Sequence, residues 1–281
     1  MIYFVLYSVC TNFDSHPSYS RSEKLKYIWL FVHLIVTLQL LMKKAIVIGA
    51  SSGIGYEISR LLIDKGWFVV VAARRTERLQ PLYQRATDRV VACNIDVTDE
   101  KAVSQIQQIF QQLGRVDLYV HVAGVGHQNR MLNADVESQT IETNVGGFGR
   151  MVGETFRYMA EHAGGHIAII SSIAGTKGLG PAPAYSATKA FQNTYLQALE
   201  QLAKNRKLNI YFTDIQPGFV DTELLSGDNN YPMMMTAAYV ARKAVRAIEK
   251  RRHVVIIDWR YRLLTAGWRC LPRWIWRNIR L

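Results

Sequence analysis

The sequence predicts an α/β fold: a doubly wound, parallel, seven-stranded sheet with helices on both faces, in three layers and one domain. Two observations predict it. Short apolar runs alternate with stretches of helical spacing from Lys44 onward, as in successive βαβ units. A glycine-rich turn follows the first apolar run and opens the first helical stretch. Because no repeat or low-complexity linker interrupts the pattern between residues 42 and 257, we expect a single domain there.

The expected strands are short, apolar and rich in β-branched residues, as is typical of strands buried on both faces. They are Ala45–Ile48, Phe68–Ala72, Val90–Cys93, Val116–Val120, His166–Ile170, Asn209–Ile215 and Val254–Ile257. Helical spacing between the strands predicts the crossover helices. These are Gly55–Lys65, Asp99–Leu113, Gln139–His162, Tyr185–Asn205 and Ala237–Arg252.

Charge and cysteine content narrow the function classes. The chain of 281 residues has a formal net charge of +12, and the segment from Arg242 to the end holds twelve Lys or Arg against Glu249 and Asp258. The excess is therefore local, and without a recognition motif it does not indicate nucleic-acid binding. The cysteines are odd in number, far apart and without metal-ligand spacing, which predicts no metal site and a reducing, cytoplasmic location. They are Cys10, Cys93 and Cys270.

The first 41 residues leave three interpretations open. Tyr27–Met42 is a run of sixteen mostly apolar residues flanked by lysines. A spanning helix needs about 20 apolar residues, and no small-residue cleavage site follows as in a signal peptide. Met42 could be the true start, the run could be a weak membrane segment, or it could be an ordinary N-terminal helix.

The glycine-rich turn predicts a site for a dinucleotide pyrophosphate. Glycines there allow a tight turn and a close approach of backbone amides to the phosphates, which rest on a helix N-terminus. The spacing G-x-x-x-G-x-G differs from the more common G-x-G-x-x-G. The residues that we assign to this turn are Gly49, Ser51, Ser52, Gly53, Ile54 and Gly55.

The end of the second strand favours NADP(H) over NAD(H). NAD-dependent enzymes usually place an acid there to bind the ribose 2′-hydroxyl, whereas an arginine accommodates a 2′-phosphate. Here Ala73 is followed by Arg74 and Arg75. A guanidinium suits a phosphate because its fork makes two charge-assisted hydrogen bonds.

Three residues form a candidate acid–base constellation. Tyr185 and Lys189 lie four residues apart at the start of an expected helix, so they share one face. A free phenol has a pKa near 10, and a neighbouring lysine would favour the phenolate. Ser172 lies thirteen residues before Tyr185, just after an expected strand, where its hydroxyl can bind a substrate oxygen.

With the glycine turn upstream, this constellation resembles the short-chain dehydrogenase/reductase family over residues 42–257. The resemblance implies that Tyr185 is the acid–base and that Lys189 binds the nicotinamide ribose and lowers the tyrosine pKa. It implies that Ser172 orients the carbonyl and that Asn144 holds a water of the proton relay. It also implies a small-molecule substrate and a homodimer or homotetramer. Further cofactor contacts carried over from the family are Asp96, Val97, Ala123, Gly124, Pro217, Gly218, Val220 and Thr222.

One departure from the family lies after the fourth strand, where N-N-A-G is replaced by His121-Val122-Ala123-Gly124. The missing asparagines put local rigidity in doubt, rather than chemistry. His121 is interpreted as a core histidine, with a substitute hydrogen-bond donor as the alternative. His127 and His166 receive no role.

The leading hypothesis is a carbonyl reductase or alcohol dehydrogenase acting on a lipophilic substrate. Met233, Met234 and Met235 would suit such a substrate, or they pack in the core. The alternatives are a 3-oxoacyl carrier-protein reductase, against which the absence of a C-terminal glycine pair counts, and a non-catalytic NADP(H)-binding regulator. The four matching catalytic residues argue against the regulator.

Residues 258–281 are predicted to form a basic amphipathic tail. Wound as one helix, it places Leu271, Trp274, Ile275 and Ile279 opposite Arg273, Arg277 and Arg280. Such a helix suits the interface of an anionic membrane, so a peripheral membrane contact is one interpretation. The other is that the tail packs on its own domain or on a neighbouring subunit.

Overall fold

A sheet of seven parallel strands forms the centre of the computed structural model, which describes residues 26, 29, 42–225 and 231–279. Its order is β3-β2-β1-β4-β5-β6-β9, which confirms the predicted doubly wound fold. The strand order reverses between β1 and β4, and doubly wound sheets bind ligands beyond the carboxyl ends of the strands at that point. The strands are β1 (Lys44–Ile48), β2 (Phe68–Ala73), β3 (Val90–Asn94), β4 (Leu118–His121), β5 (Gly165–Ile170), β6 (Ile210–Gln216) and β9 (Val254–Ile256).

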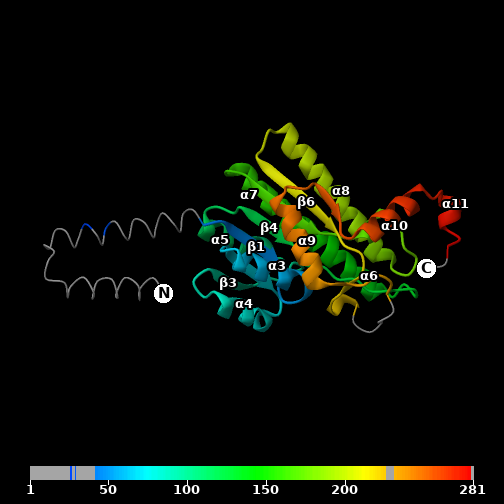
Figure 1. Ribbon diagram of the computed structural model, residues 1–281, viewed down its shortest axis with the longest axis horizontal. Coiled ribbons are helices and arrows are strands. Elements are labelled where there is room, and N and C mark those ends of the chain that lie inside the picture. The colour runs from blue at the N-terminus through cyan, green and yellow to red at the C-terminus, as the bar shows by residue number, and fades with distance from the viewer. Residues whose placement is uncertain (1–25, 27–28, 30–41, 226–230, 280–281) are drawn as a thin grey trace. The chain divides into compact units, whose positions relative to one another are not determined.

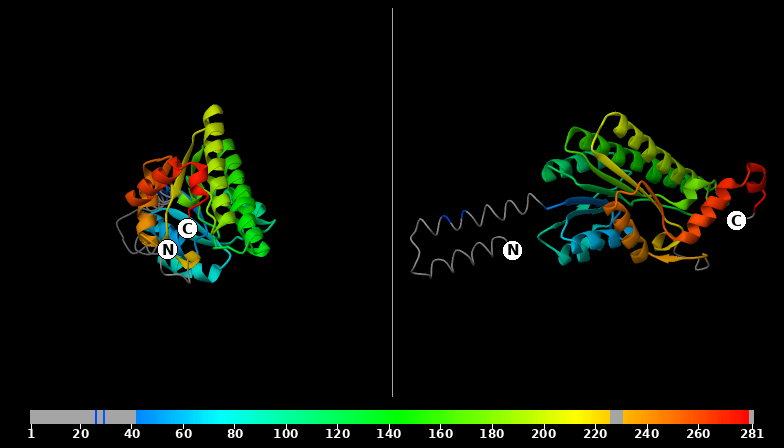
Figure 2. Two further views of the ribbon diagram at one scale, coloured as in Figure 1. Left: turned by 90° about the vertical axis from the view of Figure 1, so that its right-hand side faces the viewer. Right: turned by 45° about the horizontal axis from the view of Figure 1, so that its top comes forward.

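Helices cover both faces of the sheet (Figure 1). Neighbouring residues of one strand point to opposite faces, so they pack into two different hydrophobic cores. Val47 packs with α3 (Gly53–Asp64), α9 (Ala237–Glu249) and α10 (Trp259–Cys270). Ile46 and Ile48 pack on the other face with α5 (Ala102–Leu113), α7 (Phe148–Glu161) and α8 (Pro183–Asn205). In Figure 2, left, α7 and α8 lie on one side of the sheet, and the orange and red C-terminal helices on the other. The short α4 (Gln80–Arg85) follows a 3-10 turn at Thr76–Leu79.

Several predicted boundaries differ from the structure, among them those of the fourth strand and of the helix that follows it. The fourth strand begins at Leu118 instead of Val116. The helix expected at Gln139–His162 is part of a longer element, which starts with α6 (Ala134–Ile141) and passes through a π-helical turn (Glu142–Gly147) into α7. The earlier start has a local cause, because the side chain of Asn133 caps α6 by accepting the N–H groups of Asp135 and Val136. The π-helical turn is a feature that often marks functional sites.

The tail is two helices, so the prediction of one amphipathic helix was wrong. α10 ends at Cys270, and α11 (Arg273–Trp276) follows Pro272. Proline has no N–H to donate and its ring blocks a continuing helix, which is the reason for the break. The tail belongs to the compact unit Lys44–Leu281.

Residues Met1–Lys43 form a separate unit. The three interpretations of Tyr27–Met42 concern residues that, apart from Trp29 and Met42, lie outside the described part of the chain. Within the described residues, no helix has the length and apolar character needed to cross a membrane.

Candidate active site

The glycine turn after β1 is built from close backbone contacts. Gly49 has φ +91°, and a Cβ there would lie 2.6 Å from the backbone nitrogen of Ala123, at the end of β4. A Cβ on Gly55 would lie 2.1 Å from the carbonyl oxygen of Gly49. Only glycine fits either position. Ser52 is the first residue before α3, so the turn presents a helix N-terminus at the carboxyl edge of the sheet, a kind of position that binds phosphate groups in proteins.

The loop after β6 reaches the same turn. A Cβ on Gly53 would lie 2.9 Å from Cγ2 of Thr222, which follows the short strand β7 (Val220–Asp221). A Cβ on Gly124 would lie 3.1 Å from Oδ1 of Asn144 and 3.6 Å from Nζ of Lys189. The structure therefore brings the glycine turn, the loop after β4 and the loop after β6 together, as the predicted cofactor contacts require.

Tyr261 of α10 holds the loop after β6 at both of its ends. Its hydroxyl accepts the N–H of Phe219 at 3.2 Å and lies 2.9 Å from the carbonyl oxygen of Pro232 and 3.1 Å from that of Met233. Its ring lies against Gly218, where a Cβ would come within 2.2 Å of it. The carbonyl of the preceding Pro217 accepts the N–H of Ile173 at 3.1 Å.

The ends of β2 and β3 carry the residues predicted to contact the adenosine half of a cofactor. Arg74 is exposed. Arg75 and Arg78 both form ion pairs with Glu223, the first at 2.9 Å, and these pairs hold the pKa of Glu223 below its usual value. Asp96 accepts the N–H and hydroxyl of Thr98 through one carboxylate oxygen, at 3.0 and 2.8 Å. The following residue, Val97, packs against Gly147 of the π-helical turn.

Ser172 and Tyr185 meet beside the end of β5. Ser172 directly precedes the 3-10 turn Ile173–Thr176 and is buried, and Tyr185 lies in the first turn of α8. Burial raises the pKa of the Tyr185 phenol, and a hydrogen bond with Ser172 opposes that shift. A Cβ on Gly126 would lie 2.5 Å from the Tyr185 ring, so the backbone of the loop after β4 covers the ring. Sequence reasoning missed Gly126, although it follows Gly124 closely.

Lys189 lies one helical turn after Tyr185 and is buried. Its Nζ atom lies 5.8 Å from the centre of the Tyr185 ring. It donates to the carbonyl oxygen of Ile170 at 3.0 Å and to Oε1 of Gln192 at 2.9 Å. Burial lowers the pKa of Lys189 to about 8, and the charge of Asp214 acts against that shift.

Asn144 braces the loop after β4 with its side chain and meets Gln192 with its backbone. Its Oδ1 accepts the N–H of Val125 at 2.9 Å, and its Nδ2 donates to the carbonyl oxygen of Val125 at 2.7 Å. Its own carbonyl oxygen accepts Nε2 of Gln192 at 3.0 Å. Gln192 thus joins Lys189 to the π-helical turn. Sequence reasoning missed this residue, although its spacing of three from Lys189 places both on one helix face.

Comparison with known proteins supports the family resemblance seen in the sequence. A family profile described as short chain dehydrogenase matches residues 43–233. A protein of Myxococcus xanthus named an uncharacterized oxidoreductase is 36% identical over 197 residues, which are 68% of this chain and 77% of that protein. This chain belongs to the short chain dehydrogenase family.

Two further similarities were found, one to a curated protein and one to a solved structure. A glycine betaine reductase of Emericella nidulans is 32% identical over 76% of this chain, but the chain spans only 18% of that protein. The solved structure "ElxO with NADP Bound" has a TM-score of 0.71 at 22% identity and covers 79% of this chain and 100% of that one. The latter similarity shows the fold alone.

A buried carboxylate, that of Asp214, acts electrostatically on Lys189 of this short chain dehydrogenase. Asp214, on β6, is only 4% exposed. It accepts the hydroxyl of Ser171 and, at 2.6 Å, Nε2 of Gln216. Burial raises the pKa of Asp214, while these hydrogen bonds and Lys189 oppose the shift. Sequence reasoning missed Asp214 because it counted the residue as part of an apolar strand; an acid inside such a run was the available signal.

His121, which replaces an asparagine of the family pattern, is a core residue of the dehydrogenase. Its Nδ1 pairs with the hydroxyl of Tyr119 at 2.9 Å, and its ring meets Phe148 edge-on. Burial lowers its pKa to about 3, so the imidazole is neutral at neutral pH. His166 is also buried and pairs with Thr213 at 2.8 Å. These contacts agree with the core interpretation of His121.

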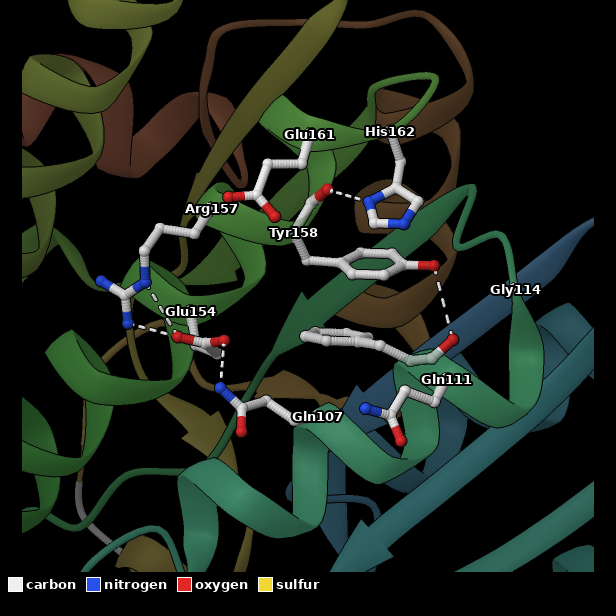
Figure 3. Close-up of a pocket in the computed structure, with 9 residues that line it drawn as sticks. Gln107, Gln111, Gly114, Glu154, Arg157, Tyr158, Glu161 and His162 are labelled. Carbon is white, nitrogen blue, oxygen red and sulfur yellow. Dashed lines mark hydrogen bonds and ion pairs between the residues drawn. The ribbon is translucent and has the colours of Figure 1, made fainter.

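A surface hollow of about 580 Å³ lies between α5 and α7 (Figure 3). None of Ser172, Tyr185 and Lys189 lines it. The Tyr158 ring stacks on Phe110 at 4.3 Å and on His162 at 4.0 Å. Glu154 accepts hydrogen bonds from Gln107 and Arg157, at 2.7 and 2.9 Å. Its carboxylate is therefore satisfied within the protein, and the hollow receives no role in the chemistry.

Proposed function

We propose that this chain is an NADP(H)-dependent oxidoreductase that interconverts a carbonyl and a secondary alcohol on a lipophilic small molecule. The observation that carries the proposal is the grouping of Ser172, Tyr185 and the buried Lys189 close to the glycine turn: Nζ of Lys189 lies 5.8 Å from the centre of the Tyr185 ring, and Ser172 opposes the rise that burial causes in the pKa of the Tyr185 phenol. A proton donor, a carbonyl-binding hydroxyl and a cation are together at the sheet edge where a dinucleotide fits.

The residues have distinct roles in the reductive direction. Ser172 donates its hydroxyl to the carbonyl oxygen and orients it. Tyr185 then gives its phenolic proton to that oxygen as it becomes a hydroxyl, and Lys189 stabilises the phenolate that remains. Bound NADPH supplies the hydride that the carbonyl carbon receives. In the oxidative direction Tyr185 takes the proton back.

The preference for NADP(H) rests on the cations at the end of β2. Arg74, Arg75 and Arg78 lie within five positions of one another, and no acid stands at the strand end. Guanidinium groups pair well with a 2′-phosphate. ElxO, whose solved structure has the same fold, binds NADP, which points in the same direction.

A lipophilic substrate is supported by exposed apolar side chains on the loops after β4 and β6. Met131 and Leu132 follow β4, while Leu224 and Met234 follow β6, and all four are exposed. Gln128 donates to the hydroxyl of Tyr231 at 3.1 Å, so the two loops meet. The neighbouring Met235 is buried in the core. Core packing was the second interpretation of these methionines in the sequence.

A panel of ketones and alcohols, offered with NADPH or NADP and followed at the nicotinamide absorbance, tests the proposal. We expect turnover of apolar ketones or secondary alcohols by the native chain and far slower turnover by Tyr185→Phe. Turnover that is unchanged in Tyr185→Phe would overturn the catalytic assignment. Absence of turnover with every substrate, together with tight NADPH binding, would favour the non-catalytic regulator.

A further inference from the structure

The outward side of α10 carries an apolar stripe. Trp259, Leu263, Ala266 and Cys270 recur at helical spacing and are all exposed. Trp259 and Leu263 are 66% and 64% exposed, and an exposed apolar patch, unlike a single exposed residue, marks an interaction surface. Beyond Pro272, Trp274 is 65% exposed on α11. We call these five residues the tail stripe.

Arginines flank the tail stripe. Helical geometry places Arg262 and Arg269 on one side of it and Arg260 on the other. Arg273 and Arg277 add two exposed cations on α11. Residues 259–279 contain these five arginines and no acidic residue, and Arg260 pairs with the neighbouring Asp258 at 2.8 Å. An exposed apolar stripe between cations matches the pattern of helices that lie in a membrane interface.

The inward side of α10 is fixed to the domain, so the tail stripe is preformed. Tyr261 and Thr265 are buried. Trp268 donates to the hydroxyl of Thr176 at 2.9 Å, and Trp276 donates to the carbonyl oxygen of Gly178 at 2.8 Å. Lys177 donates to the carbonyl oxygen of Leu271 at 3.0 Å. Both tail helices lie together at one end of the domain (Figure 1).

We propose that the tail stripe docks on an anionic lipid surface, with its apolar side chains in the acyl boundary and its arginines at the headgroups. The positive charge around the tail stripe makes a second copy of this chain an unfavourable binding partner. A two-fold interface would bring the same patch of each copy together. Four arginines without an acidic partner among the described residues would then face four more, and such like-charge contacts are costly. Anionic headgroups complement this charge instead.

Docking would also bring the catalytic segments to the membrane, a step that rests on the proposed function. The tail contacts Thr176–Gly178, which connect Ser172 to Tyr185, and through Tyr261 it contacts the loop after β6. The substrate class that follows is a ketone or secondary alcohol carried on a lipid of the same membrane.

Co-sedimentation of the full chain with vesicles tests docking without any turnover. We expect binding to phosphatidylcholine vesicles that contain phosphatidylglycerol, little binding to pure phosphatidylcholine, and weakening by salt. The double variant Trp259→Ser/Leu263→Ser should lose most of the binding. Arg269→Gln/Arg273→Gln should weaken it by about fivefold per arginine. The matched control is Leu202→Ser/Lys204→Gln, an exposed apolar and basic pair on α8, which should bind like the native chain.

Two results would overturn docking. Undiminished vesicle binding by Trp259→Ser/Leu263→Ser would assign the membrane contact to another segment, such as residues 1–41. Absence of vesicle binding by the native chain, with a dimer that the same variant dissociates in light-scattering measurements, would assign the tail stripe to a second copy.

Activity separates this proposal from the proposed function. The native chain is given a soluble ketone and a long-chain ketone held in the anionic vesicles. We expect Trp259→Ser/Leu263→Ser to reduce the soluble ketone normally and the vesicle-held ketone more slowly. If the native chain reduces neither ketone, the proposed function fails while vesicle binding still decides docking. Equal rates for both proteins on the vesicle-held ketone would overturn the link to a lipid substrate.

Discussion

Arg74 differs from the two arginines that follow it. Arg75 and Arg78 are both held by Glu223, whereas Arg74 forms no side-chain hydrogen bond or ion pair within the described residues. In the proposed NADP(H) site, Arg74 would therefore bind the 2′-phosphate without losing a partner, while Arg75 would first have to release Glu223. This contrast divides a group of arginines that look equivalent in the sequence.

The first prediction concerns these arginines. NADPH should bind at least about tenfold tighter than NADH, which is about 1.4 kcal/mol. Arg74→Ala should remove most of that difference. Glu223→Gln should tighten NADPH and leave NADH nearly unchanged, because it frees Arg75 and Arg78. Fluorescence titration of both cofactors measures these effects, and equal affinities in the native chain would contradict the prediction.

The second prediction concerns Tyr185. Tyr185→Phe keeps the ring against Gly126 but removes the hydroxyl that carries the proton. We expect kcat to fall by about 10²–10⁴-fold, the range of general acid–base catalysis, while NADPH still binds. Lys189→Ala should damage both turnover and NADPH binding. Steady-state kinetics beside cofactor titration separate the two effects, and a Tyr185→Phe enzyme with near-native kcat would contradict the assignment.

The third prediction concerns Asp214 as a positioning residue. The pKa of Lys189 is lowered to about 8, so its ammonium form is present below that pH and is lost above it. If the ammonium is the active form, kcat/KM for reduction falls above about pH 8. The charge of Asp214 raises the lysine pKa, so Asp214→Asn should move this decline to lower pH.

A pH profile of kcat/KM tests this shift directly. The exposed acid Asp64 provides the matched control, because it pairs with Arg60 and Arg85 away from the lysine. Asp64→Asn should keep the native profile. A purely structural role of Asp214 would lower activity at all pH values without moving the decline, and that result would rule out the electrostatic role.

At the scale of single residues, the sequence predicts those catalytic side chains that a local sequence pattern brings together. Tyr185 and Lys189 are separated by one helical turn, and Ser172 follows a strand, so their proximity can be inferred. The contact between Gln192 and Asn144 joins residues 48 apart, and the contact between Ser171 and Asp214 joins residues 43 apart. Such pairs depend on how α8 and β6 pack, which no local pattern shows.

At the scale of elements, α10 is a structural brace as well as a surface. Its residue Tyr261 is fully buried, and its hydroxyl links Phe219 to Pro232 and Met233 across the loop after β6. The sequence predicted an amphipathic tail wound as one helix, whereas the structure breaks it into two helices at Pro272. The buried side is formed by Tyr261, Thr265 and Trp268, which precede the proline.

The fourth prediction concerns this brace. Tyr261→Phe keeps the ring against Gly218 and removes three hydrogen-bond contacts. A buried polar group left without a partner costs about 1–3 kcal/mol of the free energy of unfolding. For a domain of this size that is a fall in Tm of about 2–12 °C. The substrate KM should rise more than kcat falls, because the loop after β6 loses its tether.

Thermal melts and steady-state kinetics measure both effects. The exposed Tyr83→Phe is the matched control and should melt like the native chain. A Tyr261→Phe variant with native Tm and native KM would show that the tether is unimportant to the loop.

At the scale of the whole molecule, the sequence predicted the sheet and its winding because each βαβ unit is a local pattern. Alternation of apolar runs and helical spacing is enough to fix seven parallel strands, and the glycine turn marks their first crossover. The π-helical turn at Glu142–Gly147 was not predictable in this way, since its bonds differ from those of an α-helix while its sequence does not.

The last prediction concerns the division of the chain at its N-terminal side. Lys44–Leu281 forms one compact unit and contains every residue of the candidate site, and β1 begins two residues after Met42. A chain of residues 42–281 should therefore fold, bind NADPH and turn over substrate with native kcat/KM. Its Tm should match that of the full chain, because β1 pairs with β2 and β4 inside the unit. Circular dichroism melts and cofactor titration of both chains test this directly. A shorter chain that aggregates, or that folds but binds NADPH more weakly, would show that the first 41 residues support the domain.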